Sequence, residues 1–295
     1  MPYLAMAVVT LVWAGNFAAG KYATAELHWA LIASVRIVAT AAAFALFVPR
    51  GTLAATRWRT IVPLALTGIV VNQAMFAMGI RLTTPSHSAL IHAMIPVVVL
   101  VMAAAFLRER PGGRAVAGLV LAVGGAAYLA LSTGAAERSA TLAGDALTLV
   151  GMTSFSGYMI LGRRVLATEG AFVTVTRAFA ASVPFAVPMF AYGAWMQDWG
   201  AVTWKGWSAL GYMIAGATFL CYSLHMWSLA RLDALKVAIF TNAQPILAGL
   251  IAQALGIESV TLPLAVSAAV VIAGVVLVQT GKREAGSQEA GDRRE

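Results

Sequence analysis

The sequence consists mainly of apolar runs of about 20 residues, a length that suits helices crossing a hydrocarbon layer of roughly 30 Å. Short breaks rich in charged and turn-forming residues separate the runs, such as "PRGTLAATRWR" (49–59) and "RERPGGR" (108–114). The pattern predicts an all-α membrane protein with ten transmembrane helices. These cover approximately residues 3–22, 29–48, 61–81, 86–106, 114–132, 142–162, 171–192, 207–230, 234–255 and 260–280.

The composition agrees with this pattern. Of the 295 residues, 60% are hydrophobic and only 11% are charged, whereas soluble domains carry about 25% charged residues. The mean hydropathy is +0.82. We therefore expect a polytopic protein whose main surroundings are the lipid bilayer. The first apolar run lacks a preceding basic segment, so we expect a transmembrane helix there and not a cleaved signal peptide.

Lysine and arginine residues are distributed unevenly over the predicted loops. Such residues concentrate on the cytoplasmic side of membrane proteins, and this predicts that both termini are cytoplasmic. The loops assigned to the cytoplasmic side contain Arg50, Arg57, Arg59, Arg108, Arg110, Arg114, Arg163, Arg164, Arg231, Lys236, Lys282 and Arg283. Because the net charge of +8 is explained by membrane orientation, no nucleic-acid partner is expected.

Two further features limit the possible chemistry. Cys221 is the single cysteine, which excludes a disulfide within the chain and argues against a cysteine-ligated metal. The segment 282–295 is polar and is predicted to be a disordered cytoplasmic tail. No metal and no cofactor are expected.

The second half of the chain is a degenerate copy of the first half. In this alignment "WAGNFAAGKY" (13–22) matches "FSGYMILGRR" (155–164), and "ALIHAMIPVV" (89–98) matches "AIFTNAQPIL" (238–247). The repeats are predicted to span residues 1–137 and 138–281. Five helices per repeat is an odd number, so the second copy would enter the membrane from the opposite side, an arrangement typical of transporters. The aligned residues are Gly15 with Gly157, Lys21 with Arg163, Arg36 with Arg177, Arg81 with Arg231, Pro96 with Pro245, and Glu109 with Glu258.

Both copies of the proline-containing helix carry polar residues in mid-span. Proline removes an intrahelical hydrogen bond and loosens the preceding turn, so Pro96 and Pro245 are predicted hinges. Polar groups inside a membrane must face protein or a water-filled cavity. We therefore predict that a substrate cavity lies between the two helices, lined by His92, Thr241, Asn242 and Gln244.

The motifs "WAGNFAAGKY", "ASVRIVATA" (33–41) and "GIRLTTPSHSALIHAMIPVVVLVMAAAFLRER" (79–110), with their second copy, resemble the drug/metabolite transporter superfamily and its bacterial EamA family. The resemblance covers about residues 1–281. It implies ten helices in two inverted five-helix repeats, a central cavity and export of metabolites. Family members of this kind include exporters of amino acids, some of which favour aromatic ones.

Further polar and aromatic residues are predicted to line the cavity. Each of them could instead form hydrogen bonds between helices, which contribute about 0.5–2 kcal/mol in membranes. The glycines at 118, 124, 125 and 274 are predicted close-packing positions between helices. The additional cavity candidates are Trp13, Asn16, Asn72, Gln73, Phe76, Tyr158, Tyr222 and His225.

The charged residues near helix ends permit two interpretations. Arg36 and Arg177 could bind a substrate carboxylate, or they could be structural anchors that contact helix ends or acidic lipid; the second interpretation is favoured. Glu109 and Glu258 could form a gate or helix-end contact, or simply be solvated, and solvation is favoured.

No carboxylate lies in mid-membrane, although proton-driven pumps usually need a buried titrating group. Facilitative transport is therefore predicted. The resemblance supplies the substrate class, amino acids including aromatic ones, and the location, a bacterial inner membrane. Proton coupling through His92 or His225 and broad multidrug export remain alternatives. The four histidines do not form the clustered set that a membrane enzyme would need, so no enzymatic activity is predicted. The internal repeat removes the need for a homodimer, and a monomer is expected.

Overall fold

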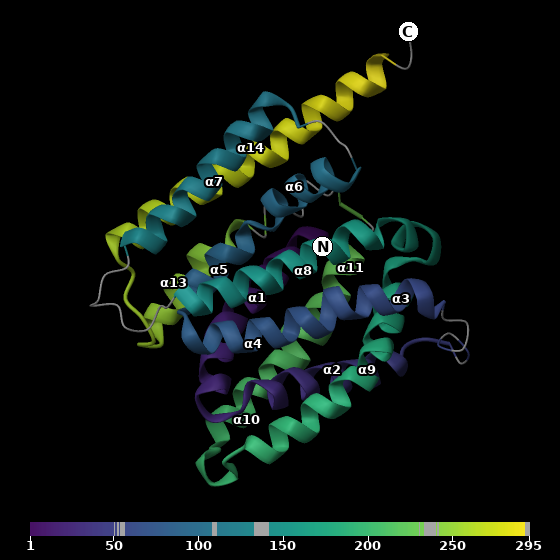
Figure 1. Ribbon diagram of the computed structural model, residues 1–295, viewed down its shortest axis with the longest axis vertical. Helices are drawn as coiled ribbons and strands as arrows, with labels where there is room; N and C mark the ends of the chain where they lie inside the picture. Colours follow the sequence, from purple (N-terminus) through teal and green to yellow (C-terminus); the bar gives the residue numbers. More distant parts are fainter. Residues whose placement is uncertain are drawn as a thin grey trace.

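The computed structural model describes residues 1–49, 51, 53, 57–107, 111–132, 142–229, 231–232, 240 and 242–292, and its regular elements are all helices (Figure 1). The first half contains α1 (Pro2–Glu26), α2 (Trp29–Ala45), α3 (Trp58–Ala65), η1 (Leu66–Val71), α4 (Asn72–Leu82), α5 (Pro85–Ala93), α6 (Ile95–Leu107) and α7 (Gly113–Ser132). The second half contains α8 (Leu142–Glu169), α9 (Ala171–Met196), η2 (Trp199–Ala201), α10 (Trp204–Gly211), η3 (Tyr212–Leu220), α11 (Cys221–Leu229), α13 (Gln244–Ala254) and α14 (Leu262–Asp292).

Seven helical stretches within the described residues are long and apolar enough to cross a membrane, and the 17-residue helix α2 is a shorter apolar one. The protein is therefore a multi-pass membrane protein. Among the described residues, helix length and apolar composition therefore identify fewer membrane spans than the ten that the sequence predicts. The helix α8 has 28 residues, but Thr153, Ser154 and Ser156 lower its hydropathy. Of the predicted run 234–255, the structure describes residue 240 and residues from 242 onward.

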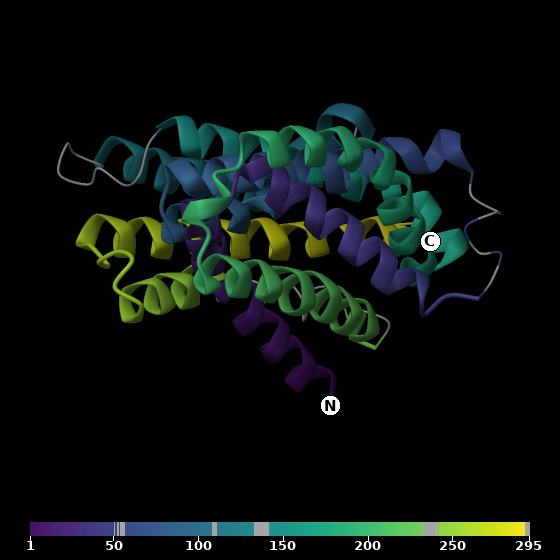
Figure 2. The ribbon, with the colours of Figure 1, turned by 90° about the horizontal axis from the view of Figure 1, so that it is seen from below.

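The C-terminal helix is longer than predicted. The structure continues α14 to Asp292, whereas the polar composition predicted a disordered tail from residue 282. Once a helix has formed, each added residue gains a hydrogen bond without a new nucleation step. Ala, Glu, Gln, Lys and Arg, which recur in this segment, also favour helix. The C-terminal end of α14 projects beyond neighbouring helices in Figure 1, and the N-terminal end of α1 does so in Figure 2.

Helices from the two halves of the chain alternate in space. The helix α7 packs along α14, α2 along α9, and α4 along α8, while α1 contacts α10, η3, α11 and α13. Small residues permit the closest approach. A Cβ atom at Gly118 would lie 2.5 Å from the carbonyl oxygen of Gly274, and one at Gly274 would lie 2.6 Å from that of Gly118. Close packing is thereby confirmed at these two glycines, whereas nothing lies within 4 Å of a Cβ at Gly124.

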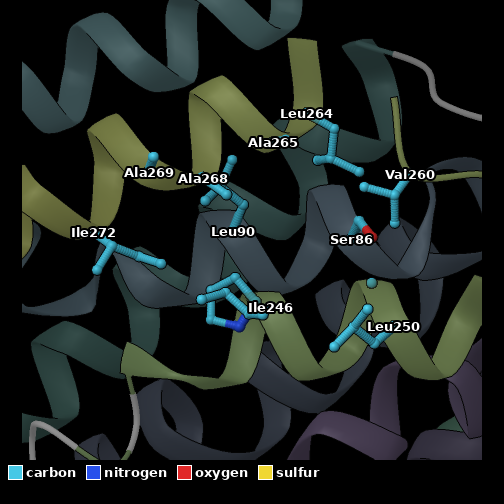
Figure 3. Close-up of a pocket in the computed structure, with 12 residues that line it drawn as sticks. Ser86, Leu90, Ile246, Leu250, Val260, Leu264, Ala265, Ala268, Ala269 and Ile272 are labelled. Atoms are coloured by element: carbon cyan, nitrogen blue, oxygen red, sulfur yellow. The ribbon is translucent and has the colours of Figure 1, made fainter. Parts of the chain in front are cut away.

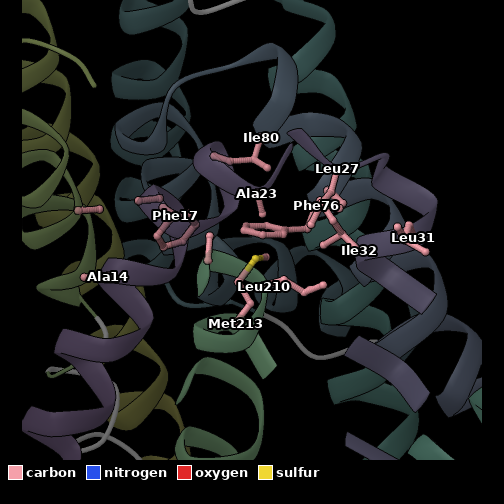
Figure 4. Packing of buried hydrophobic residues seen from close by; sticks show 14 residues of the cluster. Ala14, Phe17, Ala23, Leu27, Leu31, Ile32, Phe76, Ile80, Leu210 and Met213 are labelled. Atoms are coloured by element: carbon pink, nitrogen blue, oxygen red, sulfur yellow. The ribbon is translucent and has the colours of Figure 1, made fainter. Parts of the chain in front are cut away.

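Two π-helical segments, η1 and η3, occupy aligned positions in the two halves. A π-helix leaves a carbonyl without its usual i+4 partner, and such segments occur frequently at functional sites. The hydroxyl of Thr218 donates to the carbonyl of Met213 (2.7 Å), five residues earlier, in keeping with this wider turn. One apolar core joins helices of the first half to η3 of the second half, and it contains Phe17, Phe76 and Met213 (Figure 4).

Candidate functional site

Arg36 of α2 is buried in the middle of the bundle, with 5% of its surface exposed. Its Nη2 donates a hydrogen bond to Oγ1 of Thr218 in η3 (3.1 Å), and its Cζ lies 5.8 Å from the ring centroid of Phe76 in α4. Its Nε has no hydrogen-bond partner. The sequence favoured an anchor at the membrane face for this residue. The structure places the guanidinium against protein groups within two other helical segments, η3 and α4, and not against a helix end as that interpretation expected.

A first group of rings lies beside Arg36. Phe17, Phe76 and His92 come from α1, α4 and α5, and their centroids are 5.4–5.9 Å apart in edge-to-face arrangements. Gly20 allows Phe76 to approach α1, since a Cβ there would lie 3.3 Å from this ring. The Nδ1 of His92 lies 2.8 Å from the carbonyl oxygen of Ser88. A carbonyl can only accept, so Nδ1 carries the proton and Nε2 of the neutral ring is an acceptor.

A second group of rings joins α1 to α11. Trp13 lies 6.3 Å from Tyr222 and 5.1 Å from His225 between centroids, and Tyr222 lies 5.9 Å from Phe179 of α9. The indole Nε1 of Trp13 donates to the carbonyl of Ala217 in η3 (2.8 Å). The helix α1 therefore contributes Trp13 to this ring group and also binds η3 through the indole N–H.

Several buried polar atoms near these groups have no hydrogen-bond partner. Unsatisfied polar atoms are rare in proteins and are costly inside a membrane. They are spread over α1, α2, α5 and α11, the helices that also carry Arg36 and most of the rings. A ligand or water with hydrogen-bonding groups would satisfy them. These atoms are Asn16 Oδ1, Arg36 Nε, Thr40 Oγ1, Ser88 Oγ and Ser228 Oγ.

Three other predicted cavity residues contact neighbouring helices. Asn72 Nδ2 donates to the carbonyl of Gly151 in α8 (3.1 Å), and Asn242 Nδ2 donates to Oε1 of Gln279 in α14 (3.2 Å). Tyr158 of α8 packs against η1, where a Cβ at Gly68 would lie 2.5 Å from its ring. These contacts match the alternative that such residues connect helices.

The structure gives three remaining candidates, Gln73, Thr241 and Gln244, fewer defined contacts or none. Gln73 is buried, Gln244 is half-buried at the start of α13, and Thr241 lies outside the described residues. Sequence reasoning missed Phe17 and Thr218. Phe17 follows Trp13 by one helical turn on the same face of α1 and could have been found from that spacing.

The helices that contain the predicted hinges are interrupted. The helix α5 ends at Ala93, Met94 has φ −79° and ψ 0°, and α6 begins at Ile95, so Pro96 is its second residue. In the second half Ala243 has φ −77° and ψ −13°, and Pro245 is the second residue of α13. Proline fits the first turn of a helix because its missing N–H has no partner there. The two breaks occur at aligned positions; whether they bend during a functional cycle stays a prediction.

Polar contacts connect the two halves at the end of the bundle where α4 meets α5. Asp145 of α8 accepts a hydrogen bond from Thr83 (2.5 Å) and lies 3.1 Å from Nδ1 of His87. Within the first half, the ammonium of Lys21 donates to the carbonyls of Arg81 (3.0 Å) and Thr83 (2.6 Å) and holds the end of α4 against α1. This end of the bundle, which the charge distribution predicts to be external, is therefore closed by contacts between the two halves.

Two more carboxylates take part in this closure. Glu258 accepts from the backbone N–H of Ser86 (3.0 Å) and from its hydroxyl, so it is not merely solvated as the sequence suggested. Glu26, at the end of α1, accepts from the N–H groups of Thr203 (2.8 Å) and Gly206 (3.1 Å) at the start of α10. Carboxylates at a helix N-terminus are favoured by the helix dipole.

His28 lies between α1 and α2 at the same end. Its Nδ1 accepts from the N–H of Ala30 (3.3 Å) and caps α2, and its backbone N–H donates to Oε1 of Gln197 (2.7 Å). Partial burial, and secondarily the positive charge of Arg81, lower the pKa of His28 below its ordinary value. The folded protein therefore favours the neutral imidazole, which can act as the acceptor.

Two hollows lie away from Arg36 and the ring groups. One, of about 220 Å³, lies between α5, α13 and α14 and is lined by Leu90, Ile246 and Leu264 (Figure 3). The other, of about 530 Å³, lies between α1, α10, η3 and α13 beside Tyr22 and Tyr212. Neither includes the predicted cavity residues other than Pro245, because the rings of the first group pack against one another where a cavity was expected.

Comparisons with known proteins give one consistent picture. The EamA-like transporter family matches two stretches of the chain, residues 1–131 and 142–280. A WAT1-related protein of Arabidopsis thaliana is 25% identical over 75% of this chain and 64% of its own length. An uncharacterized transporter of Archaeoglobus fulgidus is 22% identical over 94% of this chain and 98% of its own length.

The uncharacterized transporter YyaM of Bacillus subtilis is 24% identical over 65% of this chain and 64% of its own length. The chain thus spans somewhat less than two thirds of the length of the first curated relatives that it matches. A solved crystal structure superposes with a TM-score of 0.64 at 18% identity, covering 94% of this chain and 95% of that one. This structural likeness concerns the fold alone.

Proposed function

We propose that this chain, which belongs to the EamA-like transporter family, acts as a transporter rather than an enzyme and exports small metabolites, most of all amino acids including aromatic ones. The site would lie where α1, α2, α4, α5 and α11 meet. The observation that carries this proposal is the pairing of two aromatic groups with unsatisfied buried polar atoms on these helices. Aromatic walls with a few polar groups suit an amphipathic small molecule.

Transport would proceed by alternating access between two inverted five-helix repeats, ten helices in all, at residues 1–137 and 138–281. The two family matches at 1–131 and 142–280 support this division. The aligned π-helical segments and helix breaks support it as well. The closed end at Asp145 and Glu258 would then be one of the two gates.

Export is proposed to be facilitative. The described carboxylates at Glu26, Asp145, Glu169 and Glu258 all bind groups near helix ends. None of these contacts places a titrating carboxylate beside the two aromatic groups. We place the protein in a bacterial inner membrane with both termini in the cytoplasm, as a monomer; the distribution of lysine and arginine supports the orientation.

Broad-specificity export coupled to protons is the second candidate. The position of His92 against Phe17 and Phe76, and of His225 against Trp13, favours it. Histidine changes charge near neutral pH, so a ring in the site could couple substrate release to protonation.

The test is flux of labelled phenylalanine and tryptophan through proteoliposomes, with and without an imposed pH gradient. Facilitative export predicts downhill flux that ignores the gradient and falls in Tyr222→Ala, which removes a ring from the second group. Tyr128→Ala serves as a matched control, because Tyr128 of α7 is 45% exposed. Flux that follows the pH gradient and needs His92 would support proton coupling instead. Absence of flux for every amino acid would refute this substrate class.

A further inference from the structure

We propose that Arg36 binds the carboxylate of the transported molecule, and that the second half of the molecule has no equivalent site. This inference rests on the proposed transport function and identifies the chemical group that the site requires. The starting point is a difference between two aligned arginines. Arg36 and Arg177 occupy equivalent positions in the repeat, and both are buried, with 5% and 9% of their surface exposed.

Among the residues that the structure describes, only one of the two arginines has a carboxylate partner. Nη1 of Arg177 lies 2.5 Å from Oε2 of Glu169, eight residues earlier in the chain. Among the described residues, no carboxylate forms an ion pair with Arg36. The guanidinium remains charged in proteins, and a buried charge without a counter-charge is strongly unfavourable. A negatively charged ligand would supply the missing counter-charge.

The guanidinium of Arg36 also has hydrogen-bonding capacity in reserve. Within the described part of the chain, its Nε is buried without a partner, and Nη2 donates to the neutral hydroxyl of Thr218. Adjacent N–H groups of arginine match the two oxygens of a carboxylate, and such charge-assisted pairs are stronger than neutral hydrogen bonds. Thr40, one turn further along α2, adds an unpartnered hydroxyl as a second free hydrogen-bonding group. The unpartnered hydrogen-bonding groups therefore lie on the same stretch of α2 as the positive charge that lacks a described counter-charge.

The surroundings indicate what the carboxylate is attached to. Phe76 lies 5.8 Å from Arg36 Cζ and belongs to the ring group with Phe17 and His92. Figure 4 shows the Phe76 ring between side chains of α1 and Ile32, which is one turn before Arg36 on α2. These neighbours suit an apolar or aromatic body. No described carboxylate lies among them to bind an ammonium group. We therefore expect the carboxylate of an amino acid to contribute more to binding than its amine does.

An acidic lipid does not explain these features. Arg36 is 5% exposed and contacts α4 and η3, so the guanidinium faces protein. A lipid headgroup phosphate would have to enter between packed helices. The structure therefore favours a small diffusible carboxylate.

The experiment measures the thermal stabilisation of the full-length protein in detergent by four phenylalanine analogues. Phenylalanine and 3-phenylpropionate carry the carboxylate, whereas phenethylamine and 3-phenylpropanol lack it. We expect the first two to raise the midpoint of unfolding in a saturable way and the last two to have no such effect. Because binding is measured without transport, this result can hold even if no amino acid is exported. Stabilisation by phenethylamine equal to that by phenylpropionate would overturn the proposal, as would no response to any carboxylate.

Variants then locate the interaction. In Arg36→Gln, which removes an uncompensated buried charge, we expect an unchanged or higher midpoint without ligand and at least about tenfold weaker binding of the carboxylates. The matched control Arg177→Gln leaves Glu169 unpaired, so it should lower the midpoint but retain the carboxylate response. Arg36→Lys keeps the charge without the planar fork and should show intermediate affinity. Unchanged carboxylate affinity in Arg36→Gln would assign the binding elsewhere and refute the role of Arg36.

Discussion

The indole Nε1 of Trp13 donates a 2.8 Å hydrogen bond to the carbonyl of Ala217, which lies in the π-helical segment η3. The other half of the chain contains a matching contact. There the hydroxyl of Ser154 in α8 donates, also at 2.8 Å, to the carbonyl of Thr67 in η1. Thus each π-helical segment is contacted by a donor from the helix that begins the opposite half. A carbonyl freed by local unwinding is satisfied by the other half of the molecule.

Replacing the donor should destabilise this junction. Trp13→Phe keeps a ring but removes the N–H, which leaves the Ala217 carbonyl unsatisfied. We expect a loss of about 0.5–2 kcal/mol, the range for hydrogen bonds between membrane helices, seen as a lower unfolding midpoint in detergent. The control is Trp195→Phe, because Trp195 is 88% exposed. Equal midpoints for the two variants would mean that the indole bond contributes nothing.

The contact between α7 and α14 predicts a sharp difference between two glycines of one helix. In Gly118→Ala the new Cβ would lie 2.5 Å from the Gly274 carbonyl oxygen, so the helices must separate. Overpacking of this kind costs about 1–3 kcal/mol. Gly124→Ala meets nothing within 4 Å and should be neutral or slightly stabilising, since alanine favours helix. Chemical or thermal unfolding of both variants would check this, and a stable Gly118→Ala variant would contradict the packing.

The closed end of the bundle should open more readily when Asp145 loses its charge. Asp145→Asn weakens the contacts with Thr83 and His87. The measurement is labelling of a cysteine at the buried position Ser88 by a membrane-impermeant thiol reagent, in a Cys221→Ser background. We expect labelling to increase several-fold.

Asp198→Asn is the control for this gate experiment. Asp198 is exposed near the same end of the bundle, and its carboxylate accepts from the nearby N–H of Gly200 (3.0 Å). It should leave labelling unchanged. If both variants label alike, the Asp145 contacts do not hold the halves together.

Stability should decrease in mild acid through His28. Its pKa is lower in the folded protein than in the unfolded chain, owing to burial and then to Arg81. As the pH falls below about 6.5, the ordinary histidine pKa, the unfolded chain binds the proton first, and the free energy of unfolding decreases. Protonation also removes the Nδ1 acceptor that caps α2.

His28→Asn separates this titration from the capping. Asparagine is a good helix N-cap that does not titrate, so the variant should keep its stability near pH 7.5 and lose less of it between pH 7 and 5. The measurement is the unfolding midpoint across this pH range. Identical pH profiles for the native protein and the variant would show that His28 does not contribute.

Much of the candidate site could be predicted from residue type and spacing. Trp13, Phe76, His92, Tyr222 and His225 were selected as polar or aromatic residues in mid-span, and they lie in the two ring groups. Periodicity was sufficient because these residues face inward on long apolar helices, where the face of a residue follows from its position in the turn.

Other assignments required the neighbouring helices. Asn72 and Asn242 are polar mid-span residues like the others, yet their amides bind Gly151 and Gln279. The rotation of each helix about its axis decides this, and no local pattern specifies it. The same reason explains why Arg36, predicted to be an anchor, lies inside the protein beside Phe76.

The sequence by itself determined the membrane setting, the internal repeat, the family and the breaks before Pro96 and Pro245. These features follow from local chemistry: the length of apolar runs, the backbone restriction of proline, and residue order. Only the tertiary structure decided that Glu169 neutralises Arg177 while Arg36 has no carboxylate partner among the described residues. Charge compensation depends on which side chains helix packing brings within a few ångströms of each other. The aligned sequence positions of two arginines do not show which of them has an acidic partner.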